Sequence, residues 1–159
     1  MLGVLYRVVL RPLPFPESEQ LVRVQVRHQS TDRTESGLSV AEFRALSTES
    51  NAFESVAAFS DEWCTLSGVG IPRRTWGIRV TPEFFDTLGV TPAMGRLFLS
   101  EDYVAGGANL VLLSDGLWRE QFGGRSDVMG QDFQLDGRVV TVVGVMPPSF
   151  SYPRRYGNY

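Results

Sequence analysis

Residues 133–145 read Phe-Gln-Leu-Asp-Gly-Arg-Val-Val-Thr-Val-Val-Gly-Val, two apolar runs separated by Asp136-Gly137. An Asp-Gly pair favours the type I′ turn, whose backbone twist matches that of the two strands it joins. The stretch therefore predicts a β-hairpin with strands over Phe133–Leu135 and Val139–Val145. Because a two-residue turn joins antiparallel strands, at least part of the sheet is expected to be antiparallel.

The chain before this hairpin predicts a strand followed by a helix. Asn109–Leu113, which is continuously apolar after Asn109, indicates a central strand. Ser114 can cap the helix that follows, and Gly123-Gly124 is suited to end it. Trp118 and Phe122 are spaced four apart within this helix, a spacing typical of a core-facing side.

Two further helices are predicted upstream. Thr81-Pro82-Glu83 offers a Thr as N-cap, a Pro at the first helical position and an acid in the first turn, while Gly89 is a suitable C-cap. Ser39 and Glu42 have the spacing of a capping box, which begins a helix that ends near Thr48. The buried stripe of the Thr81 helix is expected to consist of Phe84, Phe85 and Leu88.

Short strands are predicted between these helices. They cover Val22–Arg27, Ala52–Ser60, Trp63–Leu66 and Thr75–Val80, with a turn over Ser67–Pro72. Strands that alternate with single helices, together with a local hairpin, are typical of an α+β fold. We therefore expect a mixed or antiparallel sheet with about three helices.

The composition is that of a globular chain and excludes several classes of function. The 159 residues carry 15 basic and 18 acidic side chains, a net charge of −3, whereas a nucleic-acid-binding protein usually presents a basic field. All 15 basic residues are Arg, which excludes Schiff-base chemistry and a P-loop lysine. One Cys (Cys64) and one His (His28) cannot form a structural zinc site or an internal disulfide. We therefore expect no nucleic-acid partner, no cofactor and no resident metal.

Both ends of the chain read as connecting segments. Met1–Leu10 is mostly apolar but shorter than the roughly 20 residues of a membrane span, so it indicates either the first element of the domain or the outer end of a transmembrane helix. Pro12, Pro14 and Pro16 follow at alternate positions and predict a stiff, extended connector. Residues 151–159 contain Pro153 and three Tyr and read as a truncated loop.

A series of short segments, spread over nearly the whole chain, carries a likeness to a known family. They are Leu10–Pro16, Leu21–Val24, Leu38–Phe43, Phe53–Phe59, Val80–Val90, Pro92, Gly95–Phe98, Val111–Trp118, Phe122–Gly124, Leu135–Gly137 and Val142–Pro147. Their combined order resembles the extracytoplasmic core domain of MacB-type ABC-transporter permeases.

The resemblance implies a position in a larger protein. In that family the domain lies between the first two membrane helices of a permease and is an α+β module of two lobes. Residues 17–150 then correspond to the first lobe plus the hairpin, after the end of a transmembrane helix and the Pro-rich connector over residues 1–16. The truncated loop covers residues 151–159. The segment is expected on the periplasmic side of the inner membrane, as a non-catalytic domain that transmits ATP-driven motion to the export of a substrate, lipid or lipoprotein.

The same resemblance implies partners, and two other classes of function stay open beside it. The partners are a cytoplasmic ATPase subunit or domain, a second permease copy and a periplasmic adaptor. The alternative is a free-standing extracytoplasmic module that binds a small apolar ligand or a peptide. An apolar segment of about 20 residues completing Met1–Leu10 favours the permease, whereas a cleavable signal favours the free module. A hydrolase would depend on His28 with a Ser and an acid.

Several polar side chains have both a chemical and a structural interpretation. Cys64 is a candidate nucleophile but also a typical small buried residue of a strand. Glu101-Asp102 could contribute to a cation site or form a solvated turn. Gly106-Gly107 reads as a loop. Arg73-Arg74 and Arg154-Arg155 read as solvated loop charges, with contacts to lipid phosphate as the alternative.

Four residues are predicted for an interface. Arg96 and Phe98 belong to Gly95-Arg96-Leu97-Phe98, which reads as a tight turn that supports an interface or as a plain turn. Trp76 and Trp118 could line a groove for cargo, with a place in the core as the alternative.

Overall fold

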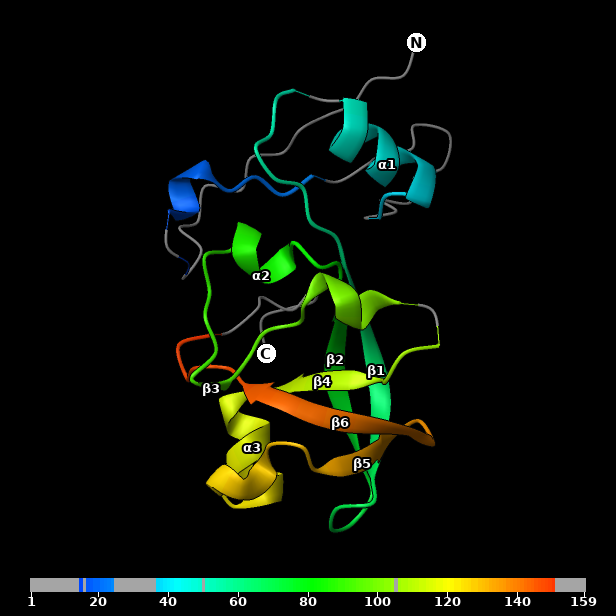
Figure 1. The fold of residues 1–159 in the computed structure, drawn as a ribbon, viewed down its shortest axis with the longest axis vertical. Coiled ribbons are helices and arrows are strands. Elements are labelled where there is room, and N and C mark those ends of the chain that lie inside the picture. Colours follow the sequence, from blue (N-terminus) through cyan, green and yellow to red (C-terminus); the bar gives the residue numbers. More distant parts are fainter. Residues whose placement is uncertain (1–14, 16, 25–36, 50, 105, 151–159) are drawn as a thin grey trace, which may run out of the picture.

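The fold is a six-stranded sheet with three helices, in a computed structural model that describes residues 15, 17–24, 37–49, 51–104 and 106–150 (Figure 1). The strand order is β2-β1-β5-β6-β3, with β4 paired to β6; the β4–β6 pair is parallel and the other pairs of the described strands are antiparallel. This confirms the α+β class with a mixed sheet. The strands are β1 (Phe59–Ser67), β2 (Arg73–Val80), β3 (Met94–Gly95), β4 (Leu110–Leu113), β5 (Asp132–Leu135) and β6 (Arg138–Val145). The α-helices are α1 (Val40–Glu49), α2 (Phe84–Thr87) and α3 (Asp115–Phe122), and the 3-10 turns are η1 (Ser18–Gln20), η2 (Ser100–Tyr103) and η3 (Ser126–Val128).

The predicted hairpin is present as β5 and β6. Leu135 and Arg138 pair across the turn, and both turn residues have positive φ, 50° at Asp136 and 75° at Gly137. This is the conformation that a type I′ turn requires. The Asp136 carboxylate also accepts a hydrogen bond of 2.8 Å from the backbone N–H of Thr65, which ties the turn to β1.

The predicted helix caps of α1 and α3 are also formed. The Ser114 hydroxyl accepts from the backbone N–H of Leu117 at 3.2 Å, and α3 ends at Gly123, whose φ is 63°. At α1, Glu42 accepts from the backbone N–H of Ser39 at 2.8 Å and Ser39 accepts from that of Glu42 at 3.3 Å, which is the reciprocal capping box.

Four local predictions differ from the structure. Of the strand expected over Val22–Arg27, Val22–Val24 form no strand, because no strand of the described chain lies beside them to accept their hydrogen bonds, and Gln25–Arg27 lie outside the described residues. Ala52–Ser60 does not form a strand of its own: β1 begins at Phe59 and runs without a break to Ser67. β4 pairs with β6 alone within the described residues, so it lies beside the main path of the sheet and is not central. The Thr81 hydroxyl accepts from Ala58 N at 3.0 Å, and the first helical residue of α2 is Phe84.

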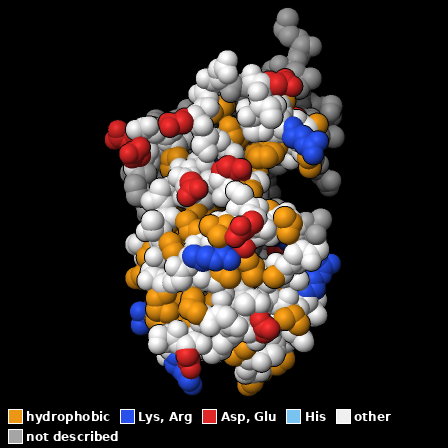
Figure 2. All heavy atoms as spheres, viewed as in Figure 1, with side chains coloured by type: hydrophobic (Ala, Val, Ile, Leu, Met, Phe, Trp, Pro, Cys, Tyr) orange, Lys and Arg blue, Asp and Glu red, His pale blue; other side chains and the backbone are white. Residues whose placement is uncertain are grey.

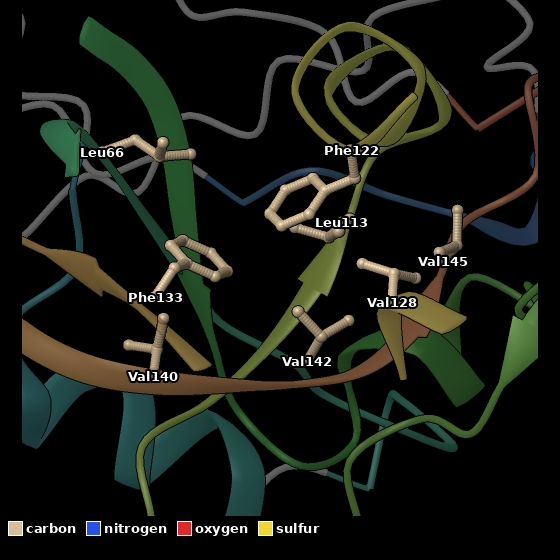
Figure 3. Close-up of a cluster of buried hydrophobic side chains, with 8 residues drawn as sticks. All are labelled: Leu66, Leu113, Phe122, Val128, Phe133, Val140, Val142 and Val145. Atoms are coloured by element: carbon tan, nitrogen blue, oxygen red, sulfur yellow. The ribbon is translucent and has the colours of Figure 1, made fainter. Parts of the chain in front are cut away.

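Two hydrophobic cores hold the fold together. The lower core lies between α3 and the sheet and contains the eight residues drawn in Figure 3: Leu66, Leu113, Phe122, Val128, Phe133, Val140, Val142 and Val145. The upper core lies around α2 and contains Phe15, Phe84, Phe85, Leu88 and Met146. Val145 and Met146 follow one another at the end of β6, so the two cores meet there.

Several predictions fall outside the described residues. They concern the apolar segment Met1–Leu10, the prolines Pro12, Pro14 and Pro16, His28, and Arg154-Arg155. Among the residues that the structure does describe, no helix is long and apolar enough to cross a membrane.

Candidate functional site

An aromatic cluster joins the two ends of the described chain. Phe15, in the Pro-rich connector, is only 6% exposed, and its ring centroid lies 6.1 Å from that of Phe150, near the other end. Phe150 in turn lies 5.9 Å from Phe85 of α2. We call this cluster the aromatic junction and define it as Phe15, Phe84, Phe85, Phe98 and Phe150.

The short helix α2 forms the centre of the junction. Consecutive residues of a helix point about 100° apart, so Phe84 and Phe85 reach different neighbours. Phe84 lies 6.0 Å from Phe59 of β1, whereas Phe85 lies 6.1 Å from Phe98. The two rings contact one another edge-on at 5.2 Å. The junction therefore connects Phe15 and Phe150, near the two ends of the described residues, to the sheet and to the turn after β3.

The turn after β3 is fixed by two glycines. Gly95 pairs with Gly144 of β6, and its φ of 73° is a conformation that side chains disfavour. A Cβ at Gly95 would lie 2.2 Å from the carbonyl oxygen of Val143, and one at Gly144 would lie 2.6 Å from that of Arg96. Residues 95 and 144 must therefore be small for β3 to lie against β6.

Arg96 and Asp102 form a forked ion pair across the loop that follows. The Arg96 guanidinium donates to both carboxylate oxygens of Asp102, at 2.6 and 3.0 Å, and also to the carbonyl of Leu97 at 2.9 Å. Asp102 accepts a further bond of 2.7 Å from the backbone N–H of Leu99. The Arg96 guanidinium, and next the Leu99 N–H, lower the pKa of Asp102. The loop is thereby closed on itself, and we call Arg96, Asp102 and Leu99 the loop clamp.

The four residues predicted for an interface belong to three separate places. Arg96 is in the loop clamp, and Phe98 is half-buried in the aromatic junction between Phe85 and Tyr103. Trp76 is in β2, where its ring contacts Trp63 edge-on at 5.0 Å. Trp118 packs against the lower core and donates from its indole N–H to the carbonyl of Arg125 at 2.9 Å. Arg96 and Phe98 thus lie in one loop, and their role in an interface stays a prediction.

The other singled-out polar residues have structural environments. Cys64 is buried in β1, and burial raises the pKa of its thiol, as do the nearby Asp136 and Glu62 carboxylates. Arg73-Arg74 belongs to β2, contrary to the loop expected: Arg73 pairs with Glu120 of α3 at 3.0 Å and Arg74 stacks on Trp63 at 5.1 Å. Asp102 is taken up by the loop clamp. Gly106-Gly107 lies in an exposed loop, as predicted.

A cleft of about 960 Å³ lies beside α2 and the start of β1. Its walls are formed by residues 17–24, by α1 and by residues 52–61, and it reaches the end of α2 at Asp86 and Thr87. Two of the lining residues, Ser55 and Thr87, are joined by a hydrogen bond of 2.7 Å between their hydroxyls. On the face of the molecule seen in Figure 2, the charged side chains around α1 and α2 are mainly acidic.

The comparison with protein families identifies the chain. Residues 6–157 match the sequence model of the MacB-like periplasmic core domain, which is nearly the whole chain. The chain belongs to this family. The MacB-like domain described here thus confirms the resemblance drawn from its segment order.

Two solved structures share the fold of this MacB-like domain. One is the extracellular domain of the noncanonic ABC-type transporter YknZ from Gram-positive bacteria, with a TM-score of 0.61, 18% identity, and 69% of this chain aligned to 57% of that chain. The other is the periplasmic region of MacB from Actinobacillus actinomycetemcomitans, with a TM-score of 0.57, 23% identity, and 71% aligned to 52%. The MacB-like domain therefore spans little more than half of each structure. No curated protein matched it significantly.

Sequence reasoning missed the aromatic junction of the MacB-like domain and its cleft. The sequence does contain a signal for the junction. Phe15 and Phe150 each lie in a Pro-rich segment, which forms neither a helix nor a strand, so neither ring can belong to the buried face of such an element. Two such aromatic residues at opposite ends of a domain are candidates for a contact with each other. The cleft has no comparable signal, since its walls come from segments far apart in the sequence.

Proposed function

We propose that this MacB-like domain is the extracytoplasmic part of an ABC-transporter permease and transmits nucleotide-driven motion of the membrane helices to the export of cargo. The family match supports the permease assignment. The fold shared with domains of two transporters agrees with it. The domain itself acts without catalysis, as a rigid body that is moved from its membrane end.

The aromatic junction is the observation that carries the mechanical role. A domain moved by its connecting segments needs those segments anchored in a packed core, because close-packed interiors transmit displacement instead of absorbing it. Phe15 provides this anchor for the connector and Phe150 provides it for the segment after the hairpin. The Phe15 ring contacts the Phe150 ring, and the Phe150 ring contacts Phe85 of α2. A pull on either segment therefore acts on α2.

The route continues from α2 to the turn after β3. Phe98 lies against Phe85, so displacement of α2 reaches the turn directly. The Gly95–Gly144 contact joins that turn to β6, and the loop clamp stiffens the residues beyond it. This gives Arg96 and Phe98 their proposed place, at the end of a rigid path where a neighbouring protein would receive the motion.

The proposed partners follow from the permease assignment. A cytoplasmic ATPase subunit or domain would supply the energy, a second permease copy would complete the transporter, and a periplasmic adaptor would contact the outer surface. The domain would lie on the periplasmic side of the inner membrane.

The stiffness of the connector provides the test. In the full-length protein with its ATPase, Pro12→Gly, Pro14→Gly and Pro16→Gly together should leave ATP hydrolysis intact and abolish the nucleotide-dependent displacement of the domain, because Gly-rich chain is flexible. Pro72→Gly, in the connection between β1 and β2, is the control and should change neither quantity. Full displacement in the triple variant would refute the proposal.

A second candidate function is a binding module for a small apolar ligand or a peptide. The cleft beside α2 favours it, because a volume of about 960 Å³ lies within the range of ligand pockets. The two functions are compatible, since a permease domain can bind what it helps to move.

A further inference from the structure

The cleft beside α2 has unusual walls, because two of them are open backbone. Val22–Val24 and Ser55–Ala57 both line the cleft, and Figure 1 shows both as elongated segments outside any helix or strand. The backbone groups of Val22, Arg23 and Val24 form no hydrogen bond with any described residue, and neither do those of Ser55, Val56 and Ala57.

The edge of β1 follows along the chain after Ala58, whose backbone N–H and C=O are both bonded to Thr81. Residues 55–58 lead directly into β1, whose residues Ser60 and Asp61 also line the cleft. On the side away from β2, β1 pairs with β5 only through Leu66 and Ser67 in the described chain. Unpaired donors and acceptors along an elongated segment are a template for another strand.

The side chains of the cleft are apolar and acidic. Phe43 and Leu46 of α1 line it, together with Phe53 and Val56. The same lining contains the carboxylates of Glu17, Glu54, Asp61 and Asp86, none of which has an ion-pair partner among the described residues.

One basic side chain lies among these carboxylates. It is Arg23, whose guanidinium stacks over the Phe59 ring at 5.3 Å. The described lining therefore carries four acids and one base, and it complements a cationic occupant with apolar groups.

We propose that this cleft binds an extended peptide in which basic and apolar side chains alternate. The peptide would add as a strand beside the open backbone of Ser55–Ala57 or of Val22–Val24. In this mode main-chain hydrogen bonds supply affinity and the side-chain environment supplies specificity. Because successive side chains of a strand point to opposite sides, alternation lets the basic groups reach the carboxylates while the apolar ones face Phe43 and Phe53.

The open backbone distinguishes a peptide from a small cationic amphiphile. A small amine could satisfy Glu54 and Asp61 and cover the apolar wall, but it would leave the row of N–H and C=O groups unpaired. Binding as an added strand uses the open backbone, the carboxylates and the apolar wall of the cleft together. It also predicts that the affinity falls with added salt, because it depends in part on the carboxylates.

The test measures binding of a defined peptide to the 159-residue chain. The probe is a labelled, end-blocked octapeptide of alternating Arg and Val, followed by fluorescence anisotropy at low and high salt. The comparison ligands are a Glu-Val octapeptide, an Arg-Val octapeptide with N-methylated backbone, and dodecyltrimethylammonium below its micelle concentration. The cleft variant is Glu54→Gln with Asp61→Asn, and its matched control is Glu83→Gln with Glu101→Gln, which removes the same charge away from the cleft.

The proposal expects binding of the Arg-Val peptide alone among the peptides. The cleft variant should bind it about tenfold more weakly at low salt, and the matched control should bind it as the wild type does. Three results would overturn the proposal: equal losses in the two variants, equal binding of the N-methylated peptide, or equally tight binding of the amphiphile at the cleft. If the cleft variant does not fold by circular dichroism, the N-methylated and Glu-Val peptides decide the question on the wild type.

Discussion

Gly95 and Gly144 face one another as paired residues of β3 and β6, and neither position has room for a side chain. A Cβ at Gly95 would lie 2.8 Å from the Cα of Gly144, and one at Gly144 would lie 2.9 Å from the carbonyl oxygen of Met94. This contact brings the turn that carries Arg96 and Phe98 against β6. The proposed path of motion passes through it.

We expect Gly95→Ala to reduce the free energy of unfolding by about 3 kcal/mol or more, because it combines a strained positive φ with a backbone collision. Gly144→Ala should also be destabilising, through the collision alone. Gly116→Ala is the control: Gly116 lies in α3 with open space around it, so Ala should stabilise by about 0.5–1 kcal/mol. Urea unfolding of the three variants checks this, and an unchanged midpoint for Gly95→Ala would contradict the contact.

The loop clamp predicts a dependence of stability on pH. Because the pKa of Asp102 is lowered in the folded protein, its ionised form stabilises the fold above its ordinary pKa, and that contribution is lost as the pH falls through the folded pKa. Asp102→Asn should therefore lower the melting temperature at pH 7, and its difference from wild type should shrink below about pH 4.

Glu101→Gln is the control for the clamp, since Glu101 is the exposed neighbour of Asp102. Melting curves of both variants between about pH 2 and pH 7 decide the matter. A difference between Asp102→Asn and wild type that stays constant down to the lowest pH would show that the Asp102 carboxylate does not act through its charge.

The aromatic junction predicts energetic coupling between the ends of the chain. Phe15→Leu and Phe150→Leu should each lower the free energy of unfolding. The double variant should lose less free energy than the sum of the two single losses, because each single variant already removes the contact between the two rings. Aromatic pairs contribute about 0.5–1.5 kcal/mol beyond buried area, so coupling of that size is expected from urea unfolding of all four proteins. Strict additivity would mean that Phe15 and Phe150 do not form a unit.

Cys64 should react slowly with thiol reagents. Its side chain is 7% exposed and its pKa is raised by burial, so the thiolate is both scarce and hidden at pH 7. We expect a rate with a disulfide reagent at least about tenfold below that of the protein unfolded in urea. Thr65→Cys in a Cys64→Ala background places the thiol at an exposed neighbouring position and should react at the rate of a free cysteine. Fast reaction of Cys64 in the folded protein would show that it is accessible.

The turn of the β5–β6 hairpin can be tested at Gly137. Its φ is 75°, a conformation that a β-branched residue resists, so Gly137→Val should lower the melting temperature. A cost of about 1–3 kcal/mol is expected from backbone strain alone, because no atom lies near enough to clash with the added Cβ. An unchanged melting temperature would contradict the type I′ assignment.

Local chemistry made much of this fold predictable. The Asp136-Gly137 turn, the Ser114 cap and the Ser39–Glu42 capping box each depend on residues within a few positions of one another, and each is formed. The Trp63–Trp76 pair could also have been derived, because a hairpin turn over Ser67–Pro72 places these two residues opposite each other.

The predictions that failed depend on contacts between distant segments. Val22–Arg27 has the alternation of a strand, but its described residues Val22–Val24 form none. A strand forms only where a second strand accepts its hydrogen bonds, and the local sequence does not say where that partner is. The Thr81 hydroxyl is predicted to cap the helix that follows it, but in the structure it accepts a hydrogen bond from the backbone N–H of the distant residue Ala58. The turn alone singles out Arg96 and Phe98 for an interface, which stays a prediction, whereas the ion pair of Arg96 with Asp102 and the ring contact of Phe98 with Phe85 depend on the folded chain.

The central claim is that nucleotide at the ATPase moves this domain as a rigid body through its connecting segments. The most direct measurement is the distance between a spin label on α3 and one in the adjoining membrane segment of the full-length protein, by pulsed electron paramagnetic resonance. Arg119→Cys provides an exposed site, with all other accessible cysteines replaced. We predict that the distance distribution shifts between the nucleotide-free and the vanadate-trapped transporter while staying narrow. Identical distributions in the two states, or a broad distribution in both, would contradict the account.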